Sequence, residues 1–369
     1  MKAENVAIGQ RVRAAIELAF EGEVTQAGVA ARIAMTPDAL SRALKGERSF
    51  ASVELVQLAD ITGSDLHELI TGEPDPQRLT VVARHSYDRD THRRDVPGRD
   101  GDDAVLRDIE LVYRQAGALA PTPPVPTTPD EMRGALGQDF VRPLADRVEE
   151  RLGIDVIRLP QLSTCYSFAI EGRLVIAVDA VGSWFRENFG IAHELGHIAR
   201  GHHDEVRVPD RHEAAANAFA AELLMPEAAI RGEDWEDVRP DRLASLVWSY
   251  GVSTRALVTR LDALGLARST VVDEWGEQST QKLLRRHLRL PMSPDGDEIT
   301  RRMTEAATRR FPLSLRNAHL RRIAAGEIGT GSLAWMLDVD ADSLEVDVPA
   351  PEPAVDPERL ADALGLTAP

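Results

Sequence analysis

The feature that most constrains this chain is a pair of histidines four residues apart in a segment of helical character. The motif is His193-Glu194-Leu195-Gly196-His197, and no proline interrupts the sequence from Phe185 to Gly201. Ile191, Leu195 and Ile198 recur at helical spacing, so we expect a helix that buries this apolar stripe. Because residues at i and i+4 are neighbours on a helix surface, both imidazoles should project from one side.

Two imidazoles on one side of a helix can bind a single metal ion. Glu194 lies about 100° further round the helix than His193, so it would sit beside the ion, where it can hold and deprotonate a bound water. This arrangement is typical of a zinc hydrolase. The motif alone is equally compatible with a surface helix that carries two solvated histidines.

A second predicted helix, over residues 210–225 and ended by Pro226, could complete a metal site. Catalytic zinc takes three protein ligands plus a water, and Glu213 could be the third. Asn217 lies one turn further on and could orient a ligand histidine. The alternative is a capping box, with Asp210 as the N-cap and Glu213 at the third helical position, which needs no metal. The combination of the two helices favours the ligand role.

Segments 189–197 and 213–226, the second of which ends in Leu-Leu-Met-Pro, together resemble the ImmA/IrrE family of metallo-endopeptidases. The resemblance implies a gluzincin-like site in which His193, His197 and Glu213 bind Zn²⁺ and Glu194 is the general base. It also implies that the substrate is a helix-turn-helix repressor. Asn217 stands where an Asp is common in the family. A neutral amide orients a histidine less strongly, so we expect a lower metal affinity.

Residues 1–72 are predicted to form five short helices: 8–20, 25–33, 37–44, 52–61 and 65–69. Their spacing resembles the Xre family of lambda-repressor-like helix-turn-helix domains, although the turn carries Ala34 where Gly is usual. In that fold the third helix enters the major groove. The resemblance implies DNA contacts from one group of residues: Gln26, Thr36, Asp38, Ser41, Arg42 and Lys45.

Charge limits how this head can bind DNA. The chain has a net charge of −17, and residues 1–72 carry seven Lys or Arg against ten Asp or Glu. Any DNA contact must therefore be local, modest in affinity and sensitive to salt. The alternative is a helix-turn-helix fold used for dimerisation or for docking another protein. A homodimer is possible, since Xre-type heads often dimerise.

The fold class predicted for the whole chain is mostly α and multidomain, with five successive regions. An all-α helix-turn-helix head (1–72) and a linker with one possible helix (73–135) precede an α+β gluzincin-like zinc metallopeptidase domain (136–266). A helical C-terminal region (267–345) and an acidic, proline-rich tail (346–369) follow.

Two further features of these regions carry predictions. Strands are predicted at 153–159, 165–170 and 173–179, and we expect one of them to bind an extended substrate by edge addition. Residues 282–325 form a basic block of eleven Lys or Arg and four Asp or Glu. This block could bind nucleic acid or pair with the protein's own acidic groups.

The remaining composition bears on the compartment. Cys165 is the single cysteine, so no intrachain disulfide can form, which suits a reducing cytoplasm. No basic region followed by an apolar run opens the chain, and no apolar stretch approaches the roughly 18 residues that span a bilayer. We therefore expect a cytoplasmic protein without a membrane partner.

These features together predict a DNA-binding regulator with a zinc endopeptidase that cleaves a repressor-type protein. Two alternatives belong to other classes. One is a non-catalytic Xre-family transcriptional regulator that uses the peptidase fold as a metal or partner sensor. The other is an antitoxin-like protein that binds a partner stoichiometrically.

Overall fold

The computed structural model describes residues 2–20, 24–62, 64, 66–73, 80–83, 99–201, 210–290 and 297–346. The chain divides into two compact units, Met1–Arg78 and Leu79–Pro369. The predicted tail at 346–369 lies outside the described residues except for Val346.

The described part of the N-terminal unit consists of five helices around one apolar core that includes Val29, Leu40 and Leu58. The five predicted helices are confirmed, with small differences at their ends, and α1 begins at Lys2 instead of Ile8. Their bounds are α1 Lys2–Phe20, α2 Gln26–Arg32, α3 Pro37–Leu44, α4 Ser52–Thr62 and α5 Leu66–Thr71.

Local chemistry explains where α2 and α3 begin. Thr25 Oγ1 accepts a hydrogen bond from the Gly28 amide, and Thr36 Oγ1 accepts one from the Ala39 amide, both at 3.2 Å. Each threonine therefore satisfies an amide that the first helical turn leaves unpaired. Between the two helices, Ala34 adopts a φ of +52°, the left-handed conformation that favours glycine.

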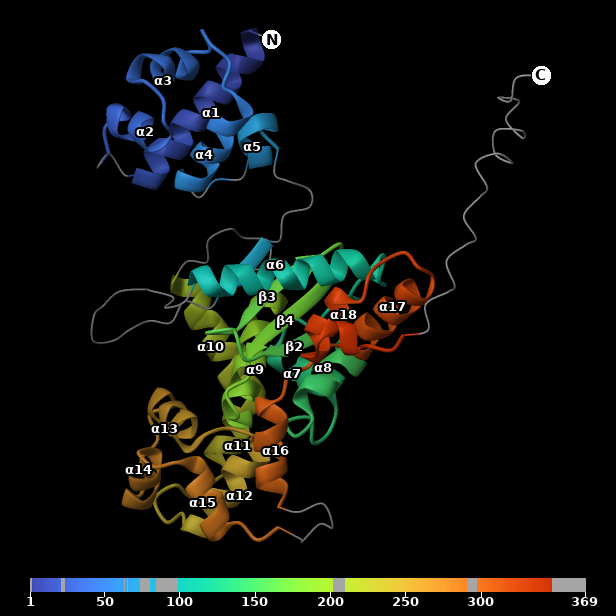
Figure 1. The fold of residues 1–369 in the computed structure, drawn as a ribbon. Helices are drawn as coiled ribbons and strands as arrows, with labels where there is room; N and C mark the ends of the chain where they lie inside the picture. Colours follow the sequence, from blue (N-terminus) through green and yellow to red (C-terminus); the bar gives the residue numbers. More distant parts are fainter. Residues whose placement is uncertain are drawn as a thin grey trace, which may run out of the picture. The chain divides into compact units, whose positions relative to one another are not determined.

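The larger unit is built on a four-stranded sheet in the order β1-β3-β4-β2 (Figure 1). The strands are β1 Thr80–Ala83, β2 Asp155–Leu159, β3 Tyr166–Ile170 and β4 Arg173–Asp179. Strands β3 and β4 form the predicted antiparallel hairpin, whose turn residues Glu171 and Gly172 both have positive φ. Strand β4 also pairs in parallel with β2, and β1 pairs antiparallel with β3. The sequence did not predict β1.

Helices cover both faces of this sheet. Alternate strand residues point to opposite sides, so Ile176 and Val178 face one core while Val175 and Ala177 face the other. The first core contains α8 Leu144–Leu152, α9 Trp184–Ala199 and α10 Asp210–Leu224. Further helices extend it: α11 Glu227–Arg231, α12 Pro240–Tyr250, α13 Thr254–Ala263, α14 Thr270–Gly276, α15 Thr280–His287 and α16 Glu298–Ala307.

Within the predicted linker at 73–135 the one possible helix is present, but the linker prediction is wrong for the residues from 99 onward, because two helices of this part pack into the cores of the larger unit. Helices α6 Arg99–Ala116 and α7 Pro129–Leu136 each contribute to a core. The proline-rich stretch between them is held by Thr122, whose amide donates to the Gly172 carbonyl at 3.0 Å and whose Oγ1 accepts from the Leu174 amide at 2.8 Å. The apolar face of α6 covers a face of the sheet that would otherwise be exposed.

The C-terminal region is likewise part of the larger unit and not a separate domain. Helices α17 Leu313–Ala324 and α18 Gly331–Leu337 lie in the same core as α6, and the 3₁₀ helix Ala341–Ser343 follows them. None of the described helices is long and apolar enough to cross a lipid bilayer. The fold is thus mostly helical, as predicted, with one small sheet at its centre.

Several arginines of the basic block bind carboxylates of the same unit. Arg310 donates to Glu149 Oε2 at 2.7 Å and to Asp146 Oδ1 at 2.8 Å, and Arg302 Nε donates to Glu298 Oε1 at 2.8 Å. Carboxylate bonds raise the pKa of Arg310 further than burial lowers it. For these arginines the structure favours pairing with the protein's own acidic groups over a free nucleic-acid surface.

Strain at Ala34 generates the first prediction. A non-glycine residue in the left-handed conformation costs about 1–2 kcal/mol, partly offset by the backbone entropy that glycine loses on folding. We therefore expect Ala34→Gly to raise the free energy of unfolding by up to about 1 kcal/mol. Ala31→Gly, at an exposed position inside α2, is the matched control and should lower it by about 1 kcal/mol. Urea denaturation measures both, and equal losses would contradict the assignment of strain to Ala34.

A buried histidine generates the second prediction. His319 is inaccessible to solvent, its Nδ1 donates to the Leu315 carbonyl at 3.0 Å, and burial lowers its pKa below the usual value. The folded state therefore binds fewer protons than the unfolded state near pH 6, so stability falls as pH drops through about 6.5. From pH 7 to pH 5, wild type should lose more unfolding free energy than His319→Leu. His67→Leu, at an exposed position, should follow wild type.

Candidate metal centre

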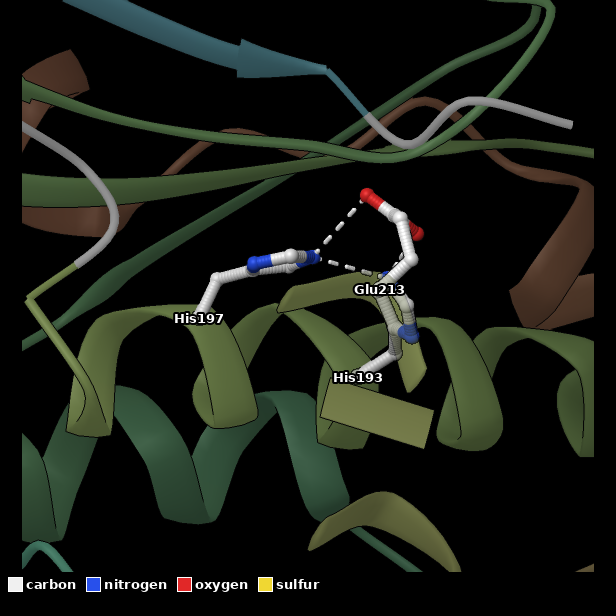
Figure 2. Close-up of side chains that lie close together, drawn as sticks. All are labelled: His193, His197 and Glu213. Carbon is white, nitrogen blue, oxygen red and sulfur yellow. Dashed lines mark hydrogen bonds and ion pairs between the residues drawn. The ribbon is translucent and has the colours of Figure 1, made fainter. Parts of the chain in front are cut away.

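Helix α9 presents the two predicted histidines to one point inside the protein (Figure 2). His193 and His197 are fully buried, and their Nε2 atoms lie 3.0 Å apart. The spacing of one helical turn accounts for this convergence. Burial excludes the alternative of two solvated histidines on a surface helix.

Helix α10 brings Glu213 to the same point, as the close-up shows (Figure 2). Glu213 Oε2 lies 3.4 Å from His193 Nε2, and Glu213 Oε1 lies 3.4 Å from His197 Nε2. Both carboxylate oxygens thus contact the histidines. The capping-box alternative placed Asp210 outside the helix as its N-cap, whereas α10 begins at Asp210 itself.

The three side chains fit a metal ion. One donor atom from each lies within 4.8 Å of the others. Tetrahedral zinc bonds of about 2.1 Å place neighbouring ligand atoms about 3.4 Å apart, which is close to the separations found here. Glu213 Oε1 is buried and has no hydrogen-bond partner among the described residues. A cation would satisfy this oxygen and both imidazole lone pairs.

Asn217 lies behind His193. Its Oδ1 is 3.0 Å from His193 Nδ1. Because an amide oxygen only accepts hydrogen bonds, Nδ1 carries the proton and Nε2 keeps its lone pair for a metal. Asn217 is exposed, so water competes for this hydrogen bond.

Glu194 lies beside the three donors and not among them. It is fully buried, and its Oε2 accepts a hydrogen bond of 2.7 Å from Ser167 Oγ. Its Oε1 has no hydrogen-bond partner in the described part of the chain. One oxygen is therefore held by β3, while the other stays available to a water or a substrate.

The charge on Glu213 is stabilised by the histidines. Burial would raise the pKa of this carboxyl group, but its contacts with His193 and His197 outweigh that effect. The pKa of Glu213 therefore lies far below its usual value, and the group is an anion across the physiological range. A buried anion of this kind stabilises a bound cation.

The sequence analysis missed two residues at this site, Ser167 and Gly196. Ser167 is a fully buried polar residue between Tyr166 and Phe168 in β3, and nothing local in the sequence marks its contact with Glu194. At Gly196 a Cβ would lie 3.0 Å from both Cα and O of Ala216, so α9 and α10 meet there backbone to backbone. A glycine inside a predicted helix was the available signal, since it costs about 1 kcal/mol relative to alanine.

The predicted DNA-binding residues belong to the N-terminal unit and lie elsewhere. Asp38 and Arg42 of α3 are exposed, as is Lys45, which follows the last residue of this helix, and Ser41 is partly buried. Gln26 at the start of α2 is also exposed, and Thr36 caps α3. The structure thus presents one side of α3 to solvent, and DNA binding by this surface stays a prediction.

Comparison with known proteins supports the predicted resemblance for part of the chain. Residues 149–262 match the family model Peptidase_M78, described as the IrrE N-terminal-like domain. The match covers less than half of the chain and includes all four residues of the cluster: His193, Glu194, His197 and Glu213. It supports a metallopeptidase of the ImmA/IrrE type in this segment. No curated protein and no solved structure matches the chain.

The close contact of α9 and α10 generates a prediction for metal binding. Gly196→Ala must push Ala216 away, which moves Glu213 relative to His193 and His197. Changes to the groups that position a metal ligand weaken metal binding by about tenfold or more. We therefore expect the affinity for zinc to fall at least about tenfold.

The matched control is Gly134→Ala in α7, where a Cβ would meet nothing within 4 Å. Titration with a competing chelator measures zinc affinity in all three proteins, and circular dichroism reports the fold. Equal affinities in Gly196→Ala and wild type would contradict this account of the helix contact.

Proposed function

We propose that this chain is a cytoplasmic, zinc-dependent endopeptidase that cleaves a repressor-type protein and carries a DNA-binding N-terminal unit. The observation that carries the proposal is the pairing of a three-donor cluster with Glu194. A purely structural metal site takes four protein ligands, whereas three donors leave one position for a water or a substrate. A buried carboxylate oxygen without a partner beside that position is what a general base needs.

His193, His197 and Glu213 would hold the ion. When bound, zinc supplies Lewis acidity toward a peptide carbonyl and lowers the pKa of water. Glu194 takes the proton from the attacking water through Oε1 and returns it to the leaving amine. Ser167 holds Oε2 during this exchange, so the carboxylate keeps its orientation.

The N-terminal unit supports a role in DNA recognition. Its α3 has a capped start, and Arg42 on this helix and Lys45 directly after it are exposed. Asp38 on the same helix opposes phosphate binding, so affinity should be modest and should fall steeply with salt. A regulator that binds DNA and cuts a repressor would combine operator recognition with release of the repressor's genes.

Substitution of the general base tests the mechanism. Glu194→Gln removes the proton acceptor but none of the three metal donors. We expect peptide cleavage to fall by at least about 10³-fold, within the range that general-base catalysis contributes, while the zinc content stays near one per chain. Zinc is measured by mass spectrometry, and cleavage is measured with a proteome-derived peptide library whose cut sites are read by mass spectrometry.

The matched control for this experiment is Glu236→Gln, an exposed glutamate, which should cleave like wild type. Cleavage by Glu194→Gln at the wild-type rate would overturn the mechanism. Zinc binding without cleavage by any of the three proteins, even at millimolar peptide, would favour the non-catalytic regulator that senses a metal or partner.

A further inference from the structure

Strand β3 lies next to the metal cluster and the proposed general base. Of the strands that the sequence predicted, β3 is the one that contacts the proposed general base, through Ser167 Oγ and Glu194 Oε2 at 2.7 Å. Strand β4 fills one side of β3. The other side of β3 is the edge on which an extended peptide would pass closest to Glu194.

The outer edge of β2 does not offer an equivalent place. Arg158 of β2 exchanges two backbone hydrogen bonds with Arg310, at 3.0 and 2.9 Å, so its edge is already bridged at mid-strand. Strand β4 lies between β3 and β2 and has no edge. Edge addition of a substrate beside the metal cluster therefore requires the outer edge of β3.

In the structure this edge is occupied by the chain itself. Strand β1 pairs antiparallel with β3, in a register that sets Val82 opposite Ser167 and Ala83 opposite Tyr166. Neighbouring strands lie about 4.8 Å apart, so the backbone of β1 lies one strand away from the residue that holds Glu194. Figure 2 shows the arrow of β1 across the upper part of the view, on the side of α9 from which the histidines project.

We infer that residues 80–83 occupy, in cis, the edge of β3 on which a substrate would bind, so that the peptidase is latent while β1 is paired. This inference rests on the proposed function. A peptide tethered beside its site acts at an effective concentration of about 1 mM, so a substrate at micromolar concentration is largely excluded.

Two features make β1 displaceable. It is only four residues long, and as an edge strand it pairs on one side within the described sheet. It also begins two residues after Arg78, where the N-terminal unit ends. Of the described elements of the larger unit, β1 is therefore the one that follows the N-terminal unit along the chain.

The pairing can be broken at β1 without touching the site. In an antiparallel pair, successive residues direct their amides alternately toward and away from the partner strand. Of the single variants Val81→Pro and Val82→Pro, one removes an amide that faces β3, and the other serves as its matched control. The double variant breaks the ladder whichever residue that is.

Hydrogen exchange measures occupancy independently of activity. In full-length Glu194→Gln, which cannot cut itself, the peptide covering 166–170 should take up deuterium at least about tenfold faster when both prolines are present. One single-proline variant should take up deuterium as fast as the double variant. The other should take it up as slowly as Glu194→Gln without any proline substitution. Equal uptake in all four proteins would overturn the inference, whatever the activity.

Cleavage then tests latency in the zinc-loaded chain with Glu194 intact. At micromolar peptide, the double-proline variant should cleave the library at least about tenfold faster than wild type, with the difference shrinking toward millimolar peptide. Cleavage of wild type within 80–83, at a rate independent of protein concentration, would also support occupancy of the substrate edge.

Failure of the inference and failure of the proposed function give different results. Equal cleavage by wild type and the double-proline variant would overturn latency and leave the peptidase standing. Suppose that neither wild type nor the double-proline variant cleaves, although the two prolines speed deuterium uptake at 166–170. The strand is then displaced as inferred, but there is no peptidase activity for it to block, so latency and the proposed function both fail.

Discussion

The burial of four ionisable side chains in one largely apolar core is the constraint on which the rest of the larger unit depends. His193, Glu194 and His197 are fully buried and Glu213 is nearly so. Polar groups in such surroundings cost several kcal/mol unless each finds a partner. The histidines and Glu213 satisfy one another only partly, and Ser167 satisfies one oxygen of Glu194. A cation among the donors would complete the arrangement.

This cluster requires close approach of elements that are distant in the sequence, and two glycines of α9 permit it. At Gly196 the helix touches the backbone of α10, which carries Glu213. At Gly190 a Cβ would lie 2.6 Å from Cys165 Sγ, at the start of the hairpin that carries Ser167. Because these two positions lack a side chain, α9 can lie close to both α10 and the start of the β3–β4 hairpin. The single cysteine belongs to this packing and not to a disulfide.

The predictions that succeeded rest on short-range patterns. Helical spacing of His193 and His197 predicted their convergence, and the spacing in residues 1–72 predicted the five helices of the N-terminal unit. For Glu213 the combination of the two helices favoured the ligand role over the capping box, and the family resemblance implied the same role. Ser167 and the packing of α6 were missed because their partners, Glu194 and the sheet, lie far away in the sequence. The proline-rich stretch before α7 lay within the predicted linker, whereas Thr122 hydrogen-bonds it to β4.

The segment that matches the peptidase family, 149–262, cannot account for the larger unit by itself. One face of its sheet carries Ile157, Phe168 and Val175, all fully buried under α6 and α17, which lie outside the match. The flanking regions therefore form one layer that the sheet requires, on the face opposite the metal cluster. Of the described elements, β1 alone joins this unit to the N-terminal unit along the chain. A signal that travels through the chain between the proposed DNA-binding surface and the proposed active site must therefore pass through the strand that lies on β3.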